Sequence, residues 1–540
     1  MVQTLPKKYF PLKNIRDQQN DILNWFLENY ENGKKYFFIE AGTGVGKSAV
    51  GVSIGRYLAN HYGSSNGEEF INSYYVLTTQ KILQQQYTDD FSKRCNFLEL
   101  KSSTNYNCSR LKGASCAEGL RGLKVADKSS AYFKHCISKC VYKKAKECFL
   151  QVEGGVTNFA YFLAETNYSG KLKPRRALII DEAHNTPNEL SKFISVSFSQ
   201  RFAESYLKIS MPILKTQHQA HKWINEIYYP AVVVRVAHFE KMMKKYANLR
   251  EKLNEFTKLV HRFEVLDKHM CKIKRFLDVY QKDNWVYSTS VFNGKKKIEF
   301  KPIDVAPFAH DMLLRNGQYC ILMSATLINF NAQCEMLGIP KDQACFISLP
   351  SPFAGKNRPI MIHGIGSMSS SSIDKTLPML AKAVTEILEQ HNDEKGIIHC
   401  HTYRIANYLK NNVESNRLLI HNSDNRDSVL RNHITSDMPT VLLSPSMTEG
   451  VDLKDETSRF QIICKVPYPY LGDNLVRKKM NRWKWWYPMQ TSKTVLQSIG
   501  RSIRNSDDYA ITYILDSDWG RFMSKNKAFL TGDFLQCIMQ

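Results

Sequence analysis

The sequence predicts an α/β protein with two parallel-sheet units, the first of which carries two insertions. Short apolar runs, each followed by a helical pattern, occur at 36–39, 74–79, 176–181 and 319–327. A second set follows at 396–401, 441–444, 460–466 and 510–515. The alternation stops at 104–148, where cysteines gather, and at 185–301, where the pattern becomes helical. Strands that alternate with helices favour parallel sheets, so the two irregular stretches are interpreted as insertions.

The composition favours a polyanionic partner. The 540 residues include 74 Lys and Arg against 51 Asp and Glu, which gives a net charge of +23 and a pI near 9.3. Nucleic acid is the first candidate for the partner of so basic a chain. A basic surface that serves only solubility is the alternative.

The chain shows no signal for a membrane or for export. No apolar run reaches the length of about eighteen residues that predicts a membrane-spanning helix. The start, MVQTLPKKYF, lacks the apolar core of a signal peptide. We therefore expect an intracellular, cytoplasmic protein, in which disulfides are rare. The 13 cysteines then require another explanation where they cluster.

A phosphate-loop pattern, A/G-x-x-x-x-G-K-S/T, stands at the end of the first apolar run. The segment Glu40–Ser48 reads EAGTGVGKS, and a helical pattern follows it. Its glycines let backbone N–H groups turn toward a phosphate, and a helix N-terminus adds partial positive charge. Lys47 can reach the β- and γ-phosphates, and the Ser48 hydroxyl can bind Mg²⁺. The sequence therefore predicts an ATP site at Ala41, Gly42, Thr43, Gly44, Val45, Gly46, Lys47 and Ser48.

Two weaker signals lie beside this loop. Arg16 and Gln19 precede it, and a glutamine there could read the adenine edge. Thr78 and Thr79 end the second apolar run, where hydroxyls can bond a sugar–phosphate backbone. Ordinary surface residues and ordinary strand termination account for them almost as well.

Five cysteines lie within one loop-rich, basic stretch. Their spacing, C-x7-C followed by C-x3-C-x7-C, lacks the C-x2-C pairs that zinc fingers prefer. Thiolates gathered from an irregular loop suit a [4Fe–4S] cluster at least as well as zinc. Unliganded cysteines are the third interpretation. The five are Cys108, Cys116, Cys136, Cys140 and Cys148.

The run RALIIDEAH, at 176–184, places two adjacent carboxylates at a strand end. Asp181 can hold Mg²⁺ through water, and Glu182 can activate the water that attacks a phosphate. From 239 to 280 apolar residues recur at steps of three and four, which predicts a long helical hairpin.

The second unit offers polar residues suited to phosphoryl transfer. The segment 497–504, QSIGRSIR, is predicted to be helical, with Gln497, Gly500, Arg501 and Arg504 on one face. Arginines so placed can stabilise charge on a transferring γ-phosphoryl group. Upstream, SMTEGVD contains Thr448, Gly450 and Asp452 at a strand–turn.

Taken in order, EAGTGVGKS, DEAH, SATL, SMTEGVD and QSIGRSIR resemble motifs I, II, III, V and VI of a superfamily 2 helicase. The long gaps after motif I and after motif II, the first with the cysteines, resemble the iron–sulfur XPD/DinG family. The resemblance implies two RecA-like motor domains with an iron–sulfur insertion and a helical arch insertion. The implied division is 1–100 with 150–190 and 302–345 for the first motor domain, 101–149 for the iron–sulfur domain, 191–301 for the arch, and 346–540 for the second motor domain.

The resemblance also implies roles for single residues. Asn105–Cys108 and Cys140–Tyr142 resemble segments that carry cluster ligands, which favours Cys108, Cys116, Cys136 and Cys140 as ligands, with Cys148 in place of Cys116 as the open alternative. Arg16 and Gln19 resemble the adenine-proximal motif. The remaining assignments are catalytic roles for Lys47, Asp181, Glu182, Gln497, Arg501 and Arg504, nucleotide contacts for Gly450 and Asp452, and DNA contacts for Thr78, Thr79 and Thr448.

The function implied is an ATP- and Mg²⁺-dependent DNA helicase that translocates 5′→3′ on single-stranded DNA. We expect a monomer acting on tailed or forked duplexes in replication, repair or recombination, and a compact form without the nuclease domain of some relatives, as in phage-encoded versions, which act in the host cytoplasm. A DEAH-type RNA helicase or translocase explains the motifs but not the cysteines. A nucleic-acid-binding scaffold with a decayed ATPase conflicts with intact Lys47, Asp181 and Glu182.

Overall fold

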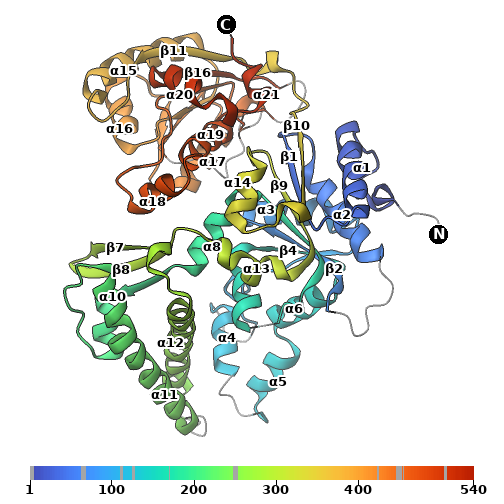
Figure 1. Cartoon of the computed structure of the whole chain (residues 1–540), viewed down its shortest axis with the longest axis vertical. Helices are drawn as coiled ribbons and strands as arrows, with labels where there is room; N and C mark the ends of the chain where they lie inside the picture. Colours follow the sequence, from blue (N-terminus) through green and yellow to red (C-terminus); the bar gives the residue numbers. More distant parts are fainter. Residues whose placement is uncertain are drawn as a thin grey trace.

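The chain folds into two α/β units, one above the other in Figure 1, with two insertions projecting from the lower one. The computed structural model describes residues 5–61, 69–109, 113–123, 128–169, 171–246, 253–422, 425–445, 453, 455–500, 502–503 and 508–539. Within these ranges, no helix combines the length and apolar character needed to cross a membrane.

The first α/β unit contains a seven-stranded parallel sheet. This confirms the predicted fold class. In spatial order its strands are β10 (Ala344–Leu349), β1 (Tyr36–Ala41), β9 (Gly317–Ser324), β5 (Arg175–Asp181), β2 (Ile71–Thr78), β4 (Gly154–Asn158) and β3 (Phe97–Glu99). Because β10 pairs with β1 through Leu349, this sheet extends beyond the predicted boundary after residue 345.

Helices cover both faces of this sheet. One face forms a core with α1 and α2 around Ile22, Phe26, Phe37, Val50 and Ile54. The helices of the unit are α1 (Asp17–Glu31), α2 (Lys47–His61), α3 (Lys81–Phe91), α7 (Phe159–Ala164), α8 (Thr186–Ile194), α13 (Ala306–Met312) and α14 (Phe330–Leu337).

The cysteine-rich insertion, which lies between β3 and β4, is built from short helices. These are α4 (Cys116–Leu123), α5 (Ala131–Ser138) and α6 (Val141–Gln151). It has no separate core, because Cys116, Cys140, Tyr142 and Phe149 belong to the same cluster as Leu178 and Ile180 of β5. The insertion is therefore attached directly to the strand that ends in Asp181.

The second insertion, called here the arch insertion, combines a helical hairpin with a small sheet. The long helices α11 (Tyr229–Tyr246) and α12 (Leu253–Val279) lie side by side, as the periodicity predicts, after the shorter α9 (Gln200–Phe202) and α10 (Gln217–Trp223). The sheet, which was not predicted, is antiparallel and contains β6 (Val196–Ser199), β8 (Lys295–Pro302) and β7 (Trp285–Phe292).

The unpredicted sheet has a local cause in the sequence. Asn293 and Gly294 join β7 to β8 with φ angles of 49° and 71°. An Asn-Gly pair with both φ angles positive is the preferred two-residue connection of a β-hairpin. The interpretation of 191–301 as purely helical is therefore wrong.

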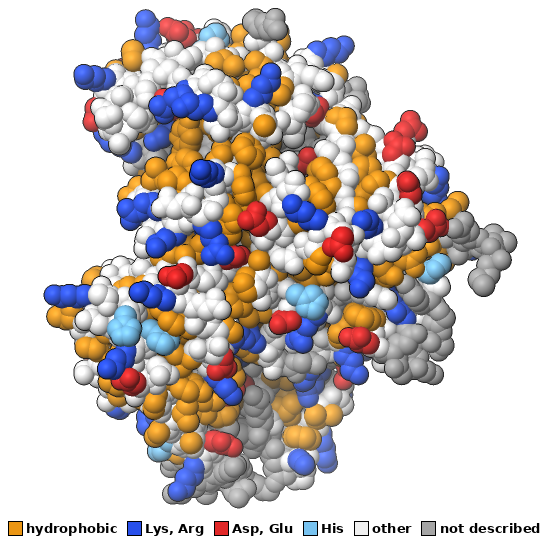
Figure 2. Space-filling model, viewed as in Figure 1, with side chains coloured by type: hydrophobic (Ala, Val, Ile, Leu, Met, Phe, Trp, Pro, Cys, Tyr) orange, Lys and Arg blue, Asp and Glu red, His pale blue; other side chains and the backbone are white. Residues whose placement is uncertain are grey.

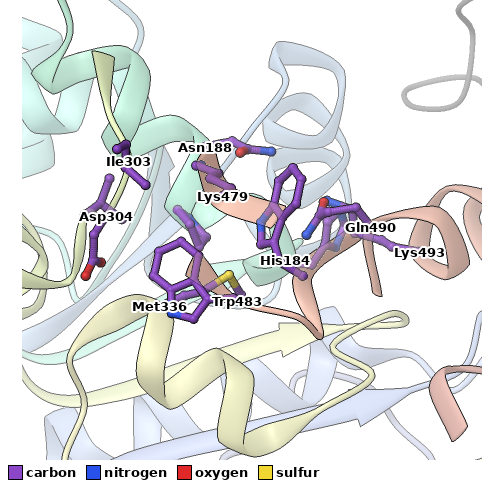
Figure 3. A pocket seen from close by; sticks show the side chains of 12 residues that line it. His184, Asn188, Ile303, Asp304, Met336, Lys479, Trp483, Gln490 and Lys493 are labelled. Atoms are coloured by element: carbon purple, nitrogen blue, oxygen red, sulfur yellow. The ribbon is translucent and has the colours of Figure 1, made fainter. Parts of the chain in front are cut away.

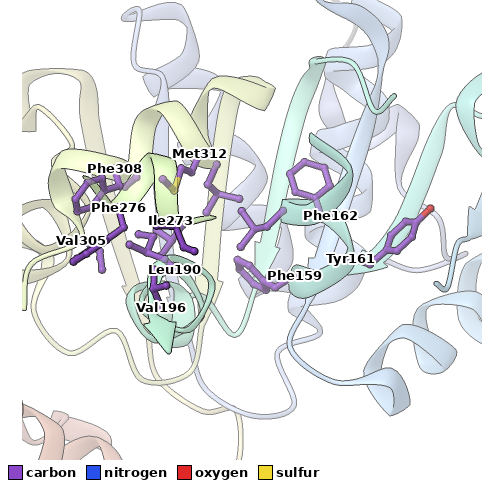
Figure 4. Packing of buried hydrophobic residues seen from close by; sticks show 14 of the residues in the cluster. Phe159, Tyr161, Phe162, Leu190, Val196, Ile273, Phe276, Val305, Phe308 and Met312 are labelled. Atoms are coloured by element: carbon purple, nitrogen blue, oxygen red, sulfur yellow. The ribbon is translucent and has the colours of Figure 1, made fainter. Parts of the chain in front are cut away.

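A continuous core joins the arch insertion to the first α/β unit. Figure 4 shows Phe159 and Phe162 of α7 near Leu190 of α8, with Ile273 and Phe276 of α12 close by. The arch helices therefore start from a well-packed base rather than from a flexible linker.

The second α/β unit contains a six-stranded parallel sheet, as predicted. Its strands are β11 (Ile360–Gly366), β16 (Ile511–Asp516), β15 (Phe460–Ile463), β12 (Gly396–His399), β14 (Val441–Ser444) and β13 (Leu418–Ile420). Its helices are α15 (Ile373–Gln390), α16 (Tyr403–Asn412), α17 (Arg426–Thr435), α18 (Asn474–Arg482), α19 (Trp486–Ile499), α20 (Asp518–Asn526) and α21 (Gly532–Leu535).

Candidate functional site

The predicted phosphate loop connects β1 to α2 and points its backbone toward the second unit. Gly44 and Gly46 have φ angles of 92° and 85°, a region that residues with a side chain rarely adopt. The Lys47 ammonium group donates to the carbonyl oxygens of Ala41, at 2.7 Å, and Gly42, at 3.5 Å. The Lys47 side chain therefore folds back over the loop, and its ammonium group lies where the loop is predicted to bind a phosphate.

The loop glycines have a second role that the sequence does not reveal. A Cβ atom on Gly42 would lie 2.6 Å from the Ser351 backbone, and one on Gly44 would lie 2.1 Å from the Phe353 ring. The hydroxyl of Ser351 also donates to the Thr43 carbonyl at 3.3 Å. The connection between the two α/β units therefore packs directly on the phosphate loop.

The predicted adenine-proximal pair contacts the same loop. Arg16 donates through its guanidinium to the Gly44 carbonyl, and Gln19 donates through its amide to the Val45 carbonyl at 2.9 Å. The Gln19 carbonyl oxygen accepts from the Arg16 N–H at 3.0 Å. The pair holds the loop in position; its contact with adenine stays a prediction.

Asp181 ends β5 in a buried position next to the loop. Its carboxylate accepts from the Glu182 N–H at 2.9 Å and from the Tyr87 hydroxyl at 3.0 Å. The pKa of Asp181 is raised to about 6, mainly by burial and next by the Glu182 carboxylate, while Lys47 and the Tyr87 hydroxyl act to lower it. A cation bound beside Asp181 would lower this pKa again.

Tyr87 of α3 is a site residue that sequence reasoning missed. Its hydroxyl hydrogen-bonds both Asp181 and Ser48, the two predicted Mg²⁺ ligands. Nothing in the spacing of α3 signals this, because the contact joins segments that are distant in sequence.

His184 connects three of the predicted motifs. Its Nδ1 lies 2.7 Å from the Ser324 hydroxyl, 3.4 Å from the Thr326 hydroxyl and 3.3 Å from the Glu182 carboxylate. Its Nε2 lies 2.6 Å from the amide nitrogen of Gln497 in α19. Glu182 itself has left-handed backbone angles, φ 52° and ψ 45°, a strain that is common at functional sites.

A cavity between the units opens beside these residues. It is lined by the phosphate loop and by α19, including Thr43, Thr326, Phe353, Gln461, Leu496 and Gly500. The helix α19 ends at Ile499, and Gly500 is its C-cap, with its N–H donating to the Leu496 carbonyl. The prediction of a helix through 504 is therefore wrong.

Several predicted site residues are not described by the structure or are not accessible to a ligand. Arg501, Arg504, Thr448, Gly450 and Asp452 lie outside the described residues. Thr78 is fully buried, and its hydroxyl donates to the Gln80 carbonyl at 3.1 Å, so a DNA strand cannot reach it in this arrangement. Thr79 is half-buried at the strand end.

Four of the five clustered cysteines converge. Cys116, Cys136 and Cys140 are buried and Cys108 is half-exposed, whereas Cys148 is exposed. Burial raises the pKa of the Cys116 and Cys136 thiols, and both Cys108 and Cys140 lie near enough to raise it further. Among the described residues, no group of three or more His, Cys, Asp or Glu side chains is arranged to hold a metal ion.

Two family models match the chain. The model described as "Type III restriction enzyme, res subunit" matches residues 12–211, and the model "Helicase C-terminal domain" matches residues 385–530. The two matches coincide with parts of the first and second α/β units.

Curated relatives extend this similarity. The ATP-dependent DNA helicase DinG of Photobacterium profundum is 22% identical over 70% of this chain and 67% of its own length. The ATP-dependent DNA helicase YoaA of Escherichia coli is 22% identical over 70% of this chain and 66% of its own length. The probable ATP-dependent helicase MJ0942 of Methanocaldococcus jannaschii is 20% identical over 98% and 96%. The chain is similar to the XPD/DinG-like superfamily 2 helicases.

Solved structures share this fold. A structure titled XPD helicase covers 96% of this chain and 98% of its own, with a TM-score of 0.61 at 15% identity. Xpd4 of S. tokodaii covers 97% and 99%, with a TM-score of 0.59 at 15% identity. The two α/β units are RecA-like, and the XPD/DinG resemblance of the sequence is confirmed. The alignment with DinG and YoaA spans about two thirds of their length.

Proposed function

We propose that the chain is an ATP-dependent DNA helicase that moves along single-stranded DNA. The observation that carries the proposal is the contact of His184 with Gln497, which joins the hydrolysis residues of the first unit to the second. Such a contact forms or breaks when the two units change their separation. Hydrolysis can thereby be coupled to movement of the units.

Each residue of the predicted ATP site has a separate proposed role in hydrolysis. Lys47 and Ser48 would hold the phosphates and Mg²⁺, with Asp181 oriented toward the same ion by Tyr87. Glu182 would position and deprotonate the attacking water. Mg²⁺, when bound, supplies neutralisation of charge on the phosphates. Arg501 and Arg504 are proposed to approach the γ-phosphate from the second unit.

DNA is the favoured substrate over RNA. The named relatives DinG and YoaA are DNA helicases, and the net charge of +23 suits either nucleic acid. The RNA alternative gives no purpose to the converging cysteines or to the arch insertion. We propose 5′→3′ translocation and action on tailed or forked duplexes, as the family resemblance implies.

The experiment is ATP-dependent unwinding of one DNA duplex with a 5′ tail, a 3′ tail or an RNA tail. We expect unwinding from the 5′ DNA tail alone. Unwinding only from an RNA tail would contradict the DNA proposal, and unwinding only from a 3′ DNA tail would contradict the polarity. A Glu182→Gln variant, which removes the proposed base at nearly constant size, is the negative control.

We propose that Cys108, Cys116, Cys136 and Cys140 hold a [4Fe–4S] cluster. These side chains fit the group, because four thiols converge while Cys148 is exposed. A cluster held by these four thiolates would supply a rigid cross-link within the insertion, which would help the insertion to separate strands.

Metal analysis of anaerobically purified protein tests this assignment. We expect iron and sulfide with broad visible absorbance, lost in Cys116→Ser and kept in Cys148→Ser. Zinc in place of iron, or iron lost in Cys148→Ser and kept in Cys116→Ser, would contradict it. Cys108→Ser should reduce unwinding more than ATP turnover.

We also propose an intracellular monomer with the domain division implied by the sequence, apart from β10, which joins the first sheet. None of the 13 cysteines forms a disulfide.

A further inference from the structure

The β-hairpin of the arch insertion ends in an exposed and partly apolar tip, called here the hairpin tip (288–297). Within it, Val291 and Phe292 of β7 remain 71% and 74% exposed. Neither side chain belongs to a hydrophobic cluster of the described residues. Isolated apolar residues on a surface are ordinary, whereas two large ones side by side at the end of a ribbon indicate a contact surface.

The strand register places cations beside these apolar side chains. Phe292 pairs with Lys295, and Val291 pairs with Lys296, across the two strands of the hairpin. Residues directly opposite one another in an antiparallel pair lie next to each other on one face. Each face of the hairpin tip therefore carries one large apolar side chain beside one lysine.

The lysines of the hairpin tip differ in what they contact. The Lys295 ammonium group lies 2.8 Å from the Glu204 carboxylate, and that of Lys297 lies 3.9 Å from Glu299, all at the surface. Exposed ion pairs are weak, so their members can exchange partners. Lys296 is exposed and forms no ion pair within the described ranges. The hairpin tip can therefore offer an ammonium group to an anion without breaking a buried contact.

The base of the hairpin is fixed against the second α/β unit. Val286 of β7 packs in one cluster with Trp483. The Trp483 indole N–H donates to the Glu335 carboxylate at 2.7 Å, and the Arg482 guanidinium lies 2.8 Å from the Asp304 carboxylate. Figure 3 shows Asp304 and Trp483 around the small pocket at this junction. The hairpin tip therefore has a defined position beside the second unit.

The face that carries Phe292 is the one turned toward the second unit. Side chains an even number of residues apart in a strand share a face, so Phe292 lies on the same face of β7 as Val286. Since Val286 packs with Trp483, the exposed ring points to the side on which α18 lies.

Basic side chains continue from the hairpin tip to the second unit. Helix α18 lies beside β7 and exposes Arg477, Lys478 and Arg482. From 474 to 506 the chain contains no Asp or Glu. Figure 2 shows Lys and Arg side chains both around the position of α18 and at the hairpin below it. Such a surface suits a polyanion with repeated phosphates.

An exposed aromatic ring beside ammonium groups has the chemistry of a single-strand contact. Aromatic side chains stack on bases, and lysines bind the phosphates that join them. In a duplex the bases cover each other's faces, so the ring can stack only on a base of a single strand. An acidic and apolar protein segment is the other occupant with matching chemistry. The long basic segment that includes α18 favours the repeated charge of DNA.

We propose that the hairpin tip binds single-stranded DNA, with Phe292 stacked on a base and Lys296 in contact with a neighbouring phosphate. The strand crosses the end of the ribbon and continues toward α18. The inference rests on the proposed function and adds a DNA contact on the arch insertion, outside both α/β units.

Binding of a fluorescein-labelled oligothymidylate, measured by anisotropy over a series of KCl concentrations, tests this contact. The variants are Phe292→Ala and Lys296→Gln, with Val234→Ala and Lys241→Gln as controls, because both control residues are exposed on α11 of the same insertion. We expect Phe292→Ala to bind about tenfold more weakly at an unchanged salt slope, because stacking involves no counterion. Lys296→Gln should lower the salt slope by about 0.7, the share of one phosphate contact on a single strand. Both controls should bind as the wild type does.

Photocrosslinking locates the contact directly. Iododeoxyuridine in the oligonucleotide reacts on irradiation with an aromatic ring that stacks on it, and mass spectrometry identifies the modified peptide. We expect an adduct on Phe292 that is absent from Phe292→Ala. An adduct only elsewhere in the chain, or equal losses of affinity in the α11 controls, would overturn the proposal.

Two further outcomes concern the occupant. Wild-type DNA affinity in both tip variants would overturn the proposal and leave a protein segment as the occupant. An oligouridylate of the same length is the RNA arm. If the tip variants weaken RNA binding but leave DNA binding unchanged, the hairpin tip serves RNA and the proposal fails.

Unwinding by the wild type separates this inference from the proposed function. Loss of affinity in the tip variants together with a wild type that does not unwind would retain the contact and reject the helicase proposal. A wild type that unwinds, with tip variants that bind normally, would do the reverse. ATP turnover without DNA should be unchanged in each variant, and thermal unfolding confirms that a weaker binder is folded.

Discussion

His184 and Gln497 meet across the boundary between the two α/β units, with 2.6 Å between the imidazole Nε2 and the amide nitrogen. Because an amide nitrogen only donates, Nε2 accepts and the imidazole proton resides on Nδ1. That nitrogen faces Ser324 and Glu182, at 2.7 and 3.3 Å. A single imidazole therefore links the proposed general base to the opposite unit.

Replacement of Gln497 by Leu should weaken the coupling between the units. The change removes the donor to His184 at nearly constant volume, and a buried hydrogen bond contributes about 1 kcal/mol. We expect DNA-stimulated ATP turnover to fall about fivefold, with unwinding reduced at least as much. Steady-state ATPase assays measure this. Thr494→Val is the control, because that hydroxyl donates to the Gln490 carbonyl of its own helix; equal losses in both variants would contradict the prediction.

Replacement of Tyr87 by Phe should impair the use of Mg²⁺. The lost hydroxyl hydrogen-bonds both Asp181 and Ser48, so both ligands lose a fixed orientation. Such outer partners affect metal affinity by roughly 10- to 100-fold. We expect a higher Mg²⁺ concentration for half-maximal ATP turnover, measured at saturating ATP. Tyr75→Phe, whose hydroxyl donates to the Lys173 carbonyl, should keep the wild-type Mg²⁺ dependence.

The sequence predicts the parts of this fold that local patterns encode. Buried parallel strands appear as apolar runs, so β1, β5 and β9 are all recognisable. The hairpin from β7 to β8 was missed although Asn293 and Gly294 signal it, because the helical period on its N-terminal side dominated the interpretation.

Local sequence patterns do not predict contacts between residues that are far apart in the chain. Tyr87 meets Asp181 only because α3 packs beside the end of β5, and no spacing expresses that. The residues of the DEAH motif are visible in sequence, yet the link from His184 to Gln497 depends on how the units close. The packing of the Phe353 ring on Gly44 likewise depends on how distant segments come together, and no local pattern in the sequence predicts it.

Replacement of Arg175 by Met should destabilise the first unit. This fully buried guanidinium donates to the Tyr74 carbonyl, at 2.9 Å, and to the Phe149 carbonyl, at 2.7 Å, and lies 4.1 Å from the centre of the Tyr75 ring. Its loss leaves buried carbonyls unpaired, which costs about 2–4 kcal/mol. A lower thermal unfolding midpoint is expected, and because α6 carries Phe149, the proposed iron–sulfur insertion should lose its structure at a lower temperature as well. The exposed Arg315→Met should change stability by no more than about 0.5 kcal/mol.

Replacement of Lys479 by Met should stabilise the protein. Burial is the main cause that lowers the pKa of Lys479 from 10.5 to about 8; Lys493 lowers it further, and Asp304 and Asp473 raise it. Below pH 8 the lysine is charged in both the folded and unfolded states, and the folded state carries the full cost of burying it. That cost, on the order of 3 kcal/mol at most, is relieved between pH 8 and 10.5, where only the unfolded state retains the proton.

The gain from Lys479→Met should therefore be largest near neutral pH and shrink as the pH rises. Thermal unfolding midpoints of wild type and variant at about pH 7 and about pH 9.5 measure the difference. The exposed Lys478→Met should give no such trend. A gain that is constant with pH would mean that apolar packing, rather than relief of a buried charge, stabilises the variant. A lower midpoint at neutral pH would mean that the Lys479 ammonium group is already paired in the folded protein.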